Sequence, residues 1–306
     1  MRDRSAPDVP AALLRHVRIT TSHVARVELG APWGVRLRPR DTVSLHHVLT
    51  GEVWLTGVGR ETVARNGDLL VLAHETAYEL RHRPGARVSD EPAWPHPAPL
   101  SARHLHGGPG ERTVLLCAEL SVTGAARAAL VRALPTVAHL PAGTVPGLDA
   151  VLDLLRAEVR TARPGAEPVV ARLTELLLVQ GIRAELDRRP EPGTWRAALT
   201  DDHIARALDA MYTTPEHPWT LVTLARTAGL SRTTFATRFR ALVGETPFAH
   251  LTRWRMALAR DLLREQPTST LATIAARVGY ADEFAFSTAF RREVGEPPGT
   301  YRAADR

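Results

Sequence analysis

Hydrophobic and polar residues alternate over short segments between about residues 17 and 122. This period of two is typical of strands with one buried face, and strands at this spacing predict a barrel or a sandwich. Thr50-Gly51 and Asn66-Gly67-Asp68 provide turn residues between them. The proline-rich stretch from Pro84 to Pro109 predicts a long surface loop. The expected strands are Val24–Leu29, Trp33–Leu37, Thr42–Leu49, Val53–Thr56, Leu69–Leu72, Ala77–Leu80 and Thr113–Val122.

After Thr123 apolar residues recur three and four positions apart, which is the period of a helix. The expected helices are Gly124–Leu134, Leu148–Arg160 and Pro168–Arg188. The last of them is apolar over more than one stripe, which favours burial against the barrel or against a second subunit. Pro190, Pro192 and Gly193 indicate a hinge. We therefore expect a β-barrel at 1–122, a helical linker and dimerisation region at 123–199, and an all-α domain at 200–306.

The last third of the chain contains an internal repeat. Ala225 and Gly229 recur as Ala275 and Gly279, at an offset of 50 residues. The offset then becomes 51, because the second copy has one additional residue in its turn. The later matches are Ser231 with Asp282, Phe235 with Phe286, Phe239-Arg240 with Phe290-Arg291, Val243-Gly244-Glu245 with Val294-Gly295-Glu296, and Pro247 with Pro298.

Each copy predicts a helix, a tight turn and a second helix. The small residue four positions before the glycine lets two helices approach, and the glycine lets the chain leave the first helix in a left-handed conformation. Ser231 and Asp282 stand where an N-cap oxygen accepts from the free amides of the next helix. Thr246 and Pro247 predict the start of a long helix that joins the two copies and ends near Glu265.

The second helix of the first copy separates an apolar face from a short, polar and cationic one. The apolar positions are Phe235, Phe239 and Leu242. The opposite positions are Thr233, Ala236, Thr237 and Arg240. Residues 231–243 also include Arg232 and Arg238 and contain no acid, which concentrates positive charge where a phosphate backbone could bind.

The second copy has the same arrangement, with Phe286 and Phe290 expected in the core. The outward positions are Phe284, Ala285, Thr288, Arg291 and Arg292. Because Phe284 is an aromatic residue on a solvent face, it either packs on the neighbouring linker or meets an apolar feature such as a thymine methyl. Two such units on one stiff helix would enter successive major-groove segments, roughly 34 Å apart.

Composition changes this interpretation little. The chain has 306 residues, of which 44% are hydrophobic and 24% charged, as in a globular protein of about two domains. The net charge is +6, but residues 200–306 contain 14 arginines and 12 acids, so charge alone does not indicate a nucleic-acid binder. No segment is apolar enough to cross a bilayer, and Cys117 is the single cysteine. We expect a soluble, cytoplasmic protein without a membrane partner.

Residues 203–303 resemble the DNA-binding domain of the AraC/XylS family of bacterial transcription regulators. The resemblance includes Trp254-Arg255-Met256, Gly279-Tyr280 and the closing Gly295, Pro298, Tyr301 and Arg302. It implies that Thr233, Ala236, Thr237 and Arg240 face bases or phosphates in one groove, and Glu283, Ala285, Thr288 and Arg291 in the next. Double-stranded promoter DNA and RNA polymerase are the partners that it implies. The alternative is a plain helical bundle whose arginines are solvated.

The segments VSLHHVLTGEVWL and RNGDLLVLAHETAYEL resemble the cupin-like sensor domain of such regulators. The second metal motif of a cupin would start at Gly67, and its last three positions are Ala73, Glu75 and Tyr78, so this motif is damaged. His46 and His47 are adjacent and point to opposite faces of a strand. A zinc site is one hypothesis, with His46 or His47, His74, His104 or His106, and Cys117 as ligands. The other is exposed histidines and a buried structural cysteine.

Three functions compete. The first is a transcription regulator, activator or repressor, whose barrel binds a small effector and changes how the DNA-binding units are presented. The second is a cupin-type metal enzyme fused to a DNA-binding domain, and the third is a DNA binder whose barrel only dimerises. The damaged motif argues against an enzyme. We favour a sensor that forms a homodimer, because a barrel can enclose a small cavity and the long helices offer a dimer surface.

Overall fold

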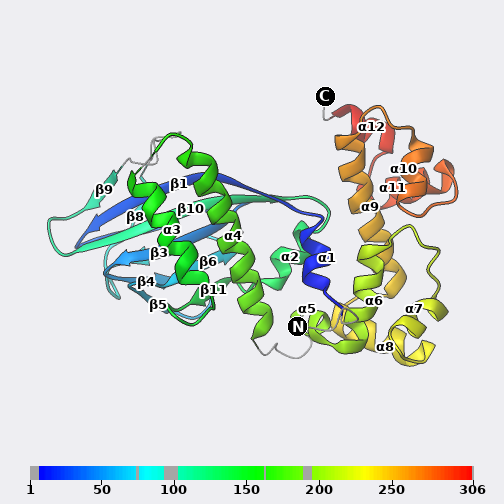
Figure 1. Cartoon of the computed structure of the whole chain (residues 1–306), viewed down its shortest axis with the longest axis horizontal. Coiled ribbons are helices and arrows are strands. Elements are labelled where there is room, and N and C mark those ends of the chain that lie inside the picture. The colour runs from blue at the N-terminus through cyan, green and yellow to red at the C-terminus, as the bar shows by residue number, and fades with distance from the viewer. Residues whose placement is uncertain (1–6, 74–75, 93–102, 162, 189–194, 305–306) are drawn as a thin grey trace. The chain divides into compact units, whose positions relative to one another are not determined.

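The computed structural model describes residues 7–73, 76–92, 103–161, 163–188 and 195–304. The chain forms two compact units, each assembled from segments that are distant in sequence (Figure 1). The β-rich unit combines residues 18–122 and 134–187. The helical unit combines the N-terminal segment up to Val17, residues 123–133 and the chain from Arg188 onward. The stretch 123–199, predicted as one linker, is thus divided between the two units.

In the described part of the chain, the β-rich unit contains a six-stranded sheet with the order β11-β6-β3-β10-β1-β9 and a five-stranded sheet with the order β5-β4-β7-β2-β8. The strands of the first sheet are β1 (Arg18–Gly30), β3 (Val43–Thr50), β6 (Leu69–Ala73), β9 (Arg103–Gly107), β10 (Arg112–Thr123) and β11 (Val137–Leu140). Those of the second are β2 (Gly34–Leu37), β4 (Glu52–Thr56), β5 (Thr62–Arg65), β7 (Tyr78–Arg81) and β8 (Ser89–Asp90).

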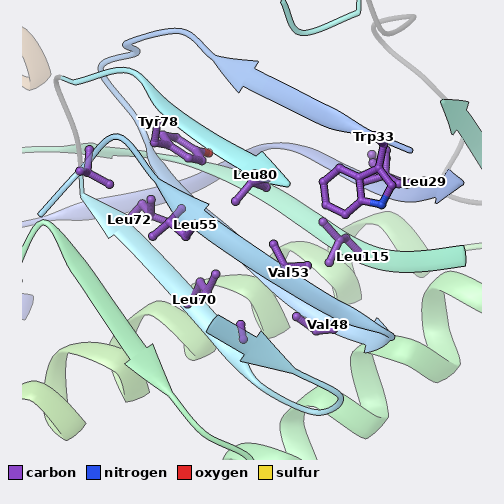
Figure 2. Packing of buried hydrophobic residues seen from close by; sticks show 14 residues of the cluster. Leu29, Trp33, Val48, Val53, Leu55, Leu70, Leu72, Tyr78, Leu80 and Leu115 are labelled. Carbon is purple, nitrogen blue, oxygen red and sulfur yellow. The ribbon is translucent and has the colours of Figure 1, made fainter. Parts of the chain in front are cut away.

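The core of the β-rich unit is built from both sheets (Figure 2). Every second residue of β1, namely Ala25, Val27 and Leu29, belongs to this core, as the period of two predicts. Val53 and Leu55 of β4 are fully buried in the same cluster. In β1 and β4 the alternation in the sequence therefore decides which side of the strand points inward.

Two helices, α3 (Leu148–Thr161) and α4 (Ala166–Asp187), pack together on the six-stranded sheet (Figure 1). Gly181 lets α4 approach β6, because a Cβ atom at this position would lie 3.2 Å from Cγ2 of Val71. The hydroxyl of Thr174 on α4 lies 2.6 Å from the hydroxyl of Thr21 on β1. One apolar stripe of α4 is buried in this way, while Val169 and Leu176 stay exposed.

The helical unit contains two helix-turn-helix units connected by α9 (Figure 1). Its helices are α1 (Val9–Leu14), α2 (Arg127–Ala133), α5 (Trp195–Thr200), α6 (Asp202–Thr213), α7 (Leu221–Thr227), α8 (Arg232–Val243), α9 (Pro247–Glu265), α10 (Leu271–Arg277), α11 (Glu283–Val294) and α12 (Pro298–Ala304). The predicted join by one long helix is therefore confirmed. Within the described residues no helix is both long and apolar enough to span a bilayer.

Several elements differ from the sequence prediction. The loop predicted for Pro84–Pro109 is wrong at β8 and β9, because β9 pairs in parallel with β1, and such long-range pairing leaves no local pattern. The short β5 and β11 were not predicted. Residues 93–102 of the predicted loop and the hinge residues Pro190, Pro192 and Gly193 lie outside the described residues.

The aromatic pairs in the two helix-turn-helix units generate a stability prediction. Phe239 is fully buried, so Phe239→Ala should lower the free energy of unfolding by about 3–5 kcal/mol. Phe284→Ala removes the same side chain from a position that is 78% exposed. This substitution should change the free energy of unfolding by less than about 1 kcal/mol. Denaturant unfolding of both variants compares the two free energies. Equal losses would show that Phe239 does not form part of the core.

Candidate functional site

The first helix-turn-helix unit is formed by α7, a tight turn and α8. Gly229 adopts the left-handed conformation in the turn, with φ of 67°. The hydroxyl of Ser231 then accepts a hydrogen bond from the amide of Thr234 at 3.2 Å and caps α8. Phe235 and Phe239 are fully buried, with their ring centroids 5.6 Å apart. The opposite face of α8 is therefore turned to solvent.

The second unit repeats this geometry with α10 and α11. Gly279 has φ of 80°, and the Asp282 carboxylate accepts from the amides of Phe284 and Ala285 at 2.9 and 2.8 Å. The amide of Leu230 donates to the carbonyl of Ala225, and the amide of Tyr280 donates to the carbonyl of Ala275. Because these bonds are equivalent in the two copies, the additional residue of the second copy follows Tyr280. The caps, the turn glycines and the buried aromatic pair thus agree with the predicted repeat.

All candidate DNA-binding residues lie on α8 and α11, and none of them is buried. The exposed ones are Arg232, Thr233, Thr237, Arg240, Glu283, Phe284, Ala285, Thr288, Arg291 and Arg292. Ala236 is half-buried. Because Phe284 is 78% exposed, the structure does not support its packing on the linker helix. The residues form two outward surfaces, which we call the α8 face and the α11 face.

Arg238 does not contribute to the α8 face as its neighbours do. Its Nε donates to Oδ2 of Asp201 at 3.0 Å, at the N-terminus of α6. Burial alone would raise the pKa of Asp201, but the hydrogen bonds from Arg238 and from the backbone amide of Ile204 outweigh it and hold this pKa below its ordinary value. The charge of Arg238 is thus paired with Asp201 of the same chain, which leaves Arg232 and Arg240 as the arginines of this face.

Arg255 of α9 contacts the loop before the first helix-turn-helix unit and the turn of the second. Its Nε donates to the carbonyl of Pro215 at 2.8 Å and its Nη2 to the carbonyl of His217 at 2.9 Å, just before α7. Its guanidinium carbon lies 5.8 Å from the ring centroid of Tyr280, in the turn of the second unit. We call Arg255, Pro215, His217, Gly279 and Tyr280 the linker clamp. The sequence pattern singled out Arg255 and Tyr280 but gave no role for them.

Gly279 is required in the linker clamp for two reasons. Its positive φ is unfavourable for other residues. In addition, a Cβ atom there would lie 2.5 Å from Nη2 of Arg255 and 2.8 Å from the carbonyl oxygen of Pro215. The close approach holds the turn of the second unit against the loop that precedes α7. This contact therefore joins the second unit to the segment that leads into the first.

A cavity of about 480 Å³ lies in the β-rich unit, lined by residues of β1, β2, β3, β7 and β10. His46 of β3 is buried beside it, with Nδ1 at 3.1 Å from Sγ of Cys117 and Nε2 at 2.6 Å from the hydroxyl of Tyr78. His47 points to the other face, and its Nδ1 lies 3.1 Å from the carbonyl oxygen of Asp68. The expectation that the two histidines diverge is confirmed.

The structure brings together only two of the proposed zinc ligands within its described residues. His46 and Cys117 are together, but Nε2 of His106 lies 3.4 Å from Oγ of Ser89 instead, and His74 lies outside the described residues. Among the described residues, no three His, Cys, Asp or Glu side chains are close enough to hold a metal ion. Burial and the charge of Glu91 raise the pKa of the Cys117 thiol to about 12. The full ligand set stays a prediction.

Two family models match the chain. The cupin family matches residues 8–187, and a helix-turn-helix domain family matches residues 224–304. A Streptomyces lividans protein named as an AraC-like transcription regulator is 36% identical to this chain. The match covers 92% of the chain and 94% of the Streptomyces protein. The transcriptional regulator AlkR of Acinetobacter baylyi is 26% identical over 96% of the chain and 99% of its own length. The solved DNA-binding domain of AdpA with target DNA is 33% identical, covers 34% of the chain and 93% of that domain, and has a TM-score of 0.32.

The linker clamp can be tested with a pair of glycine substitutions. Gly279 and Gly295 both have positive φ, but a Cβ at Gly295 would have no atom within 4 Å. Gly279→Ala should therefore lower the free energy of unfolding by about 1–3 kcal/mol more than Gly295→Ala, because only the first forces atoms apart. Denaturant unfolding measures both. Equal losses would mean that backbone strain alone acts at Gly279 and that the close approach is unimportant.

Proposed function

The chain belongs to the AraC family of DNA-binding transcription regulators, and on that premise we propose that the α8 and α11 faces bind successive major-groove segments of its operator. One observation carries this assignment: both second helices bury a phenylalanine pair and turn their threonines and arginines outward. Short hydroxyl side chains and guanidinium groups suit contacts to base edges and phosphates. The linker clamp would hold the two faces in one register on the duplex.

The relatives that match the chain over nearly its whole length are transcription regulators and not enzymes. The expectation that this cupin-like chain is not an enzyme is therefore confirmed. The match of the cupin family to residues 8–187 also confirms the predicted class of the N-terminal region. The β-rich unit thus accompanies a DNA-binding unit in a regulator.

As part of the same proposal, the cavity of the β-rich unit binds a small effector that changes operator affinity. Its volume is within the range of about 300–1,000 Å³ that is usual for small-molecule sites. A homodimer is supported by exposed apolar residues on α3 and α4, where Leu154, Val169 and Leu176 are 58%, 43% and 41% exposed. A cytoplasmic location and contact with RNA polymerase are what this function would require.

Two arginines of α8 provide the test of DNA binding. Arg240→Ala should weaken operator binding and reduce the slope of affinity against salt by about one counterion, because it removes a phosphate contact. Arg238→Ala is the matched control, since this exposed arginine is held by Asp201 and its loss should leave the slope unchanged. Fluorescence anisotropy at several salt concentrations, on an operator identified by genome-wide footprinting, measures both slopes. Equal slopes for Arg240→Ala and the unsubstituted protein would exclude the α8 face.

Thr237 tests base reading at one position of the operator. Thr237→Ala should cost about 1–3 kcal/mol of discrimination at a single base pair and little at the others, because a side-chain hydroxyl contacts one base edge. Anisotropy on a set of operators with each base pair changed in turn measures the loss. A uniform loss across all operators would instead assign Thr237 to the phosphate backbone.

A further inference from the structure

The walls of the cavity in the β-rich unit are mainly apolar. They include Ala25, Val27 and Leu29 of β1, together with Leu37, Leu80 and Leu115 from the strands around it. Five of these six side chains are nearly fully buried, and Leu37 packs against the same cluster. A ligand with many hydroxyl groups would lose hydrogen bonds to water against such walls. The cavity therefore favours a ligand whose body is apolar.

One group of polar side chains in the cavity surrounds His46. Its two ring nitrogens lie within hydrogen-bonding distance of the thiol of Cys117 and the hydroxyl of Tyr78, and Ser44 also lines the cavity. Burial raises the pKa of both Cys117 and Tyr78, so both groups stay protonated at neutral pH. This side of the cavity can bind one oxygen function through the His46 ring, the Cys117 thiol and the Ser44 hydroxyl.

The arginines that line the cavity already contact carboxylates. Arg40 forms ion pairs with Glu119 and with Glu91, the latter at 2.7 Å. Arg38 lies 3.6 Å from Asp90. Each arginine that lines the cavity in the described part of the chain thus faces a carboxylate. An anionic ligand would compete with Glu91 and Glu119 for Arg40 and would be repelled by both.

From these three observations we infer that the cavity binds an uncharged, mostly apolar molecule with one hydroxyl or carbonyl group, and that it discriminates against acids. The oxygen function would lie beside His46 and Cys117, and the apolar body would lie against Val27, Leu29 and Leu115. This ligand class deepens the proposed effector-sensing function and rests on it. It does not depend on how the α8 and α11 faces bind DNA.

A matched series of probes tests the inference with the full chain. 4-Ethylbenzyl alcohol, 4-ethylbenzoate and 4-ethylbenzylamine share one apolar body and are neutral, anionic and cationic at pH 7. Calorimetric titration should show that the alcohol binds, and binds at least about tenfold more tightly than the benzoate or the amine, because only the charged probes need to be desolvated without a free partner. Benzoate binding as tight as alcohol binding would overturn the inference, and so would no binding of the alcohol at a Kd of about 1 mM or below.

Glu119→Gln provides an electrostatic control in the same cavity. The substitution keeps the size of the side chain and removes one of the two carboxylates that face Arg40. The ratio of the benzoate Kd to the alcohol Kd should fall by about threefold or more. The reason is that Arg40 then faces one carboxylate fewer and can pair with the carboxylate of the benzoate. An unchanged difference in a variant with a native circular dichroism spectrum would contradict the charge argument.

Operator anisotropy with each probe separates this inference from the proposed function. If the protein binds its operator and the alcohol binds without changing that affinity, the ligand class holds and effector sensing fails. If the protein binds its operator, and the benzoate binds most tightly and changes that affinity, the effector-sensing function is supported and the inferred ligand class is wrong. If the protein does not bind the operator even without a probe, the assignment of the α8 and α11 faces as the DNA-binding surface fails, and the ligand class is not affected.

Discussion

The burial of two phenylalanine pairs is the constraint on which the DNA-binding unit depends. The cores of the two helix-turn-helix units are filled by Phe235 with Phe239 and by Phe286 with Phe290. These buried pairs set the rotation of α8 and α11 about their own axes. A helix that buries positions four residues apart must expose the positions opposite them. The threonines and arginines are thus outward because the phenylalanines are inward. The same apolar burial that stabilises the fold also presents the recognition surface.

A second constraint acts between the two units. The second core includes Met256, Ala259 and Leu263 of α9, so the linker helix belongs to the unit that it carries. Arg255, on the same helix, bonds to backbone carbonyls before α7 and stacks on Tyr280. Backbone carbonyls are acceptors that no side-chain change can remove. The two faces are consequently related by main-chain contacts as well as by apolar packing, which suits a protein that must match a regular DNA helix.

The β-rich unit combines an apolar cavity with a compact polar cluster. The buried polar groups around His46 satisfy one another, which lets them lie inside a hydrophobic core at little cost. The charged side chains at Arg40 are likewise paired. Such a cavity is selective because its arginines already face carboxylates, so a ligand is chosen by its shape and by a single polar contact.

The sequence alone determined the local features of this protein. Periods of two and of three to four residues, the matched glycines Gly229 and Gly279, and the caps Ser231 and Asp282 depend on neighbours within a few positions, so they can be read along the chain. Only the tertiary structure decided the rest: the pairing of Arg238 with Asp201, the strand β9 beside β1, and the meeting of Arg255 with Gly279. These contacts join residues that are distant in sequence. Their partners are chosen by the packing of whole elements, which leaves no periodic pattern in the chain.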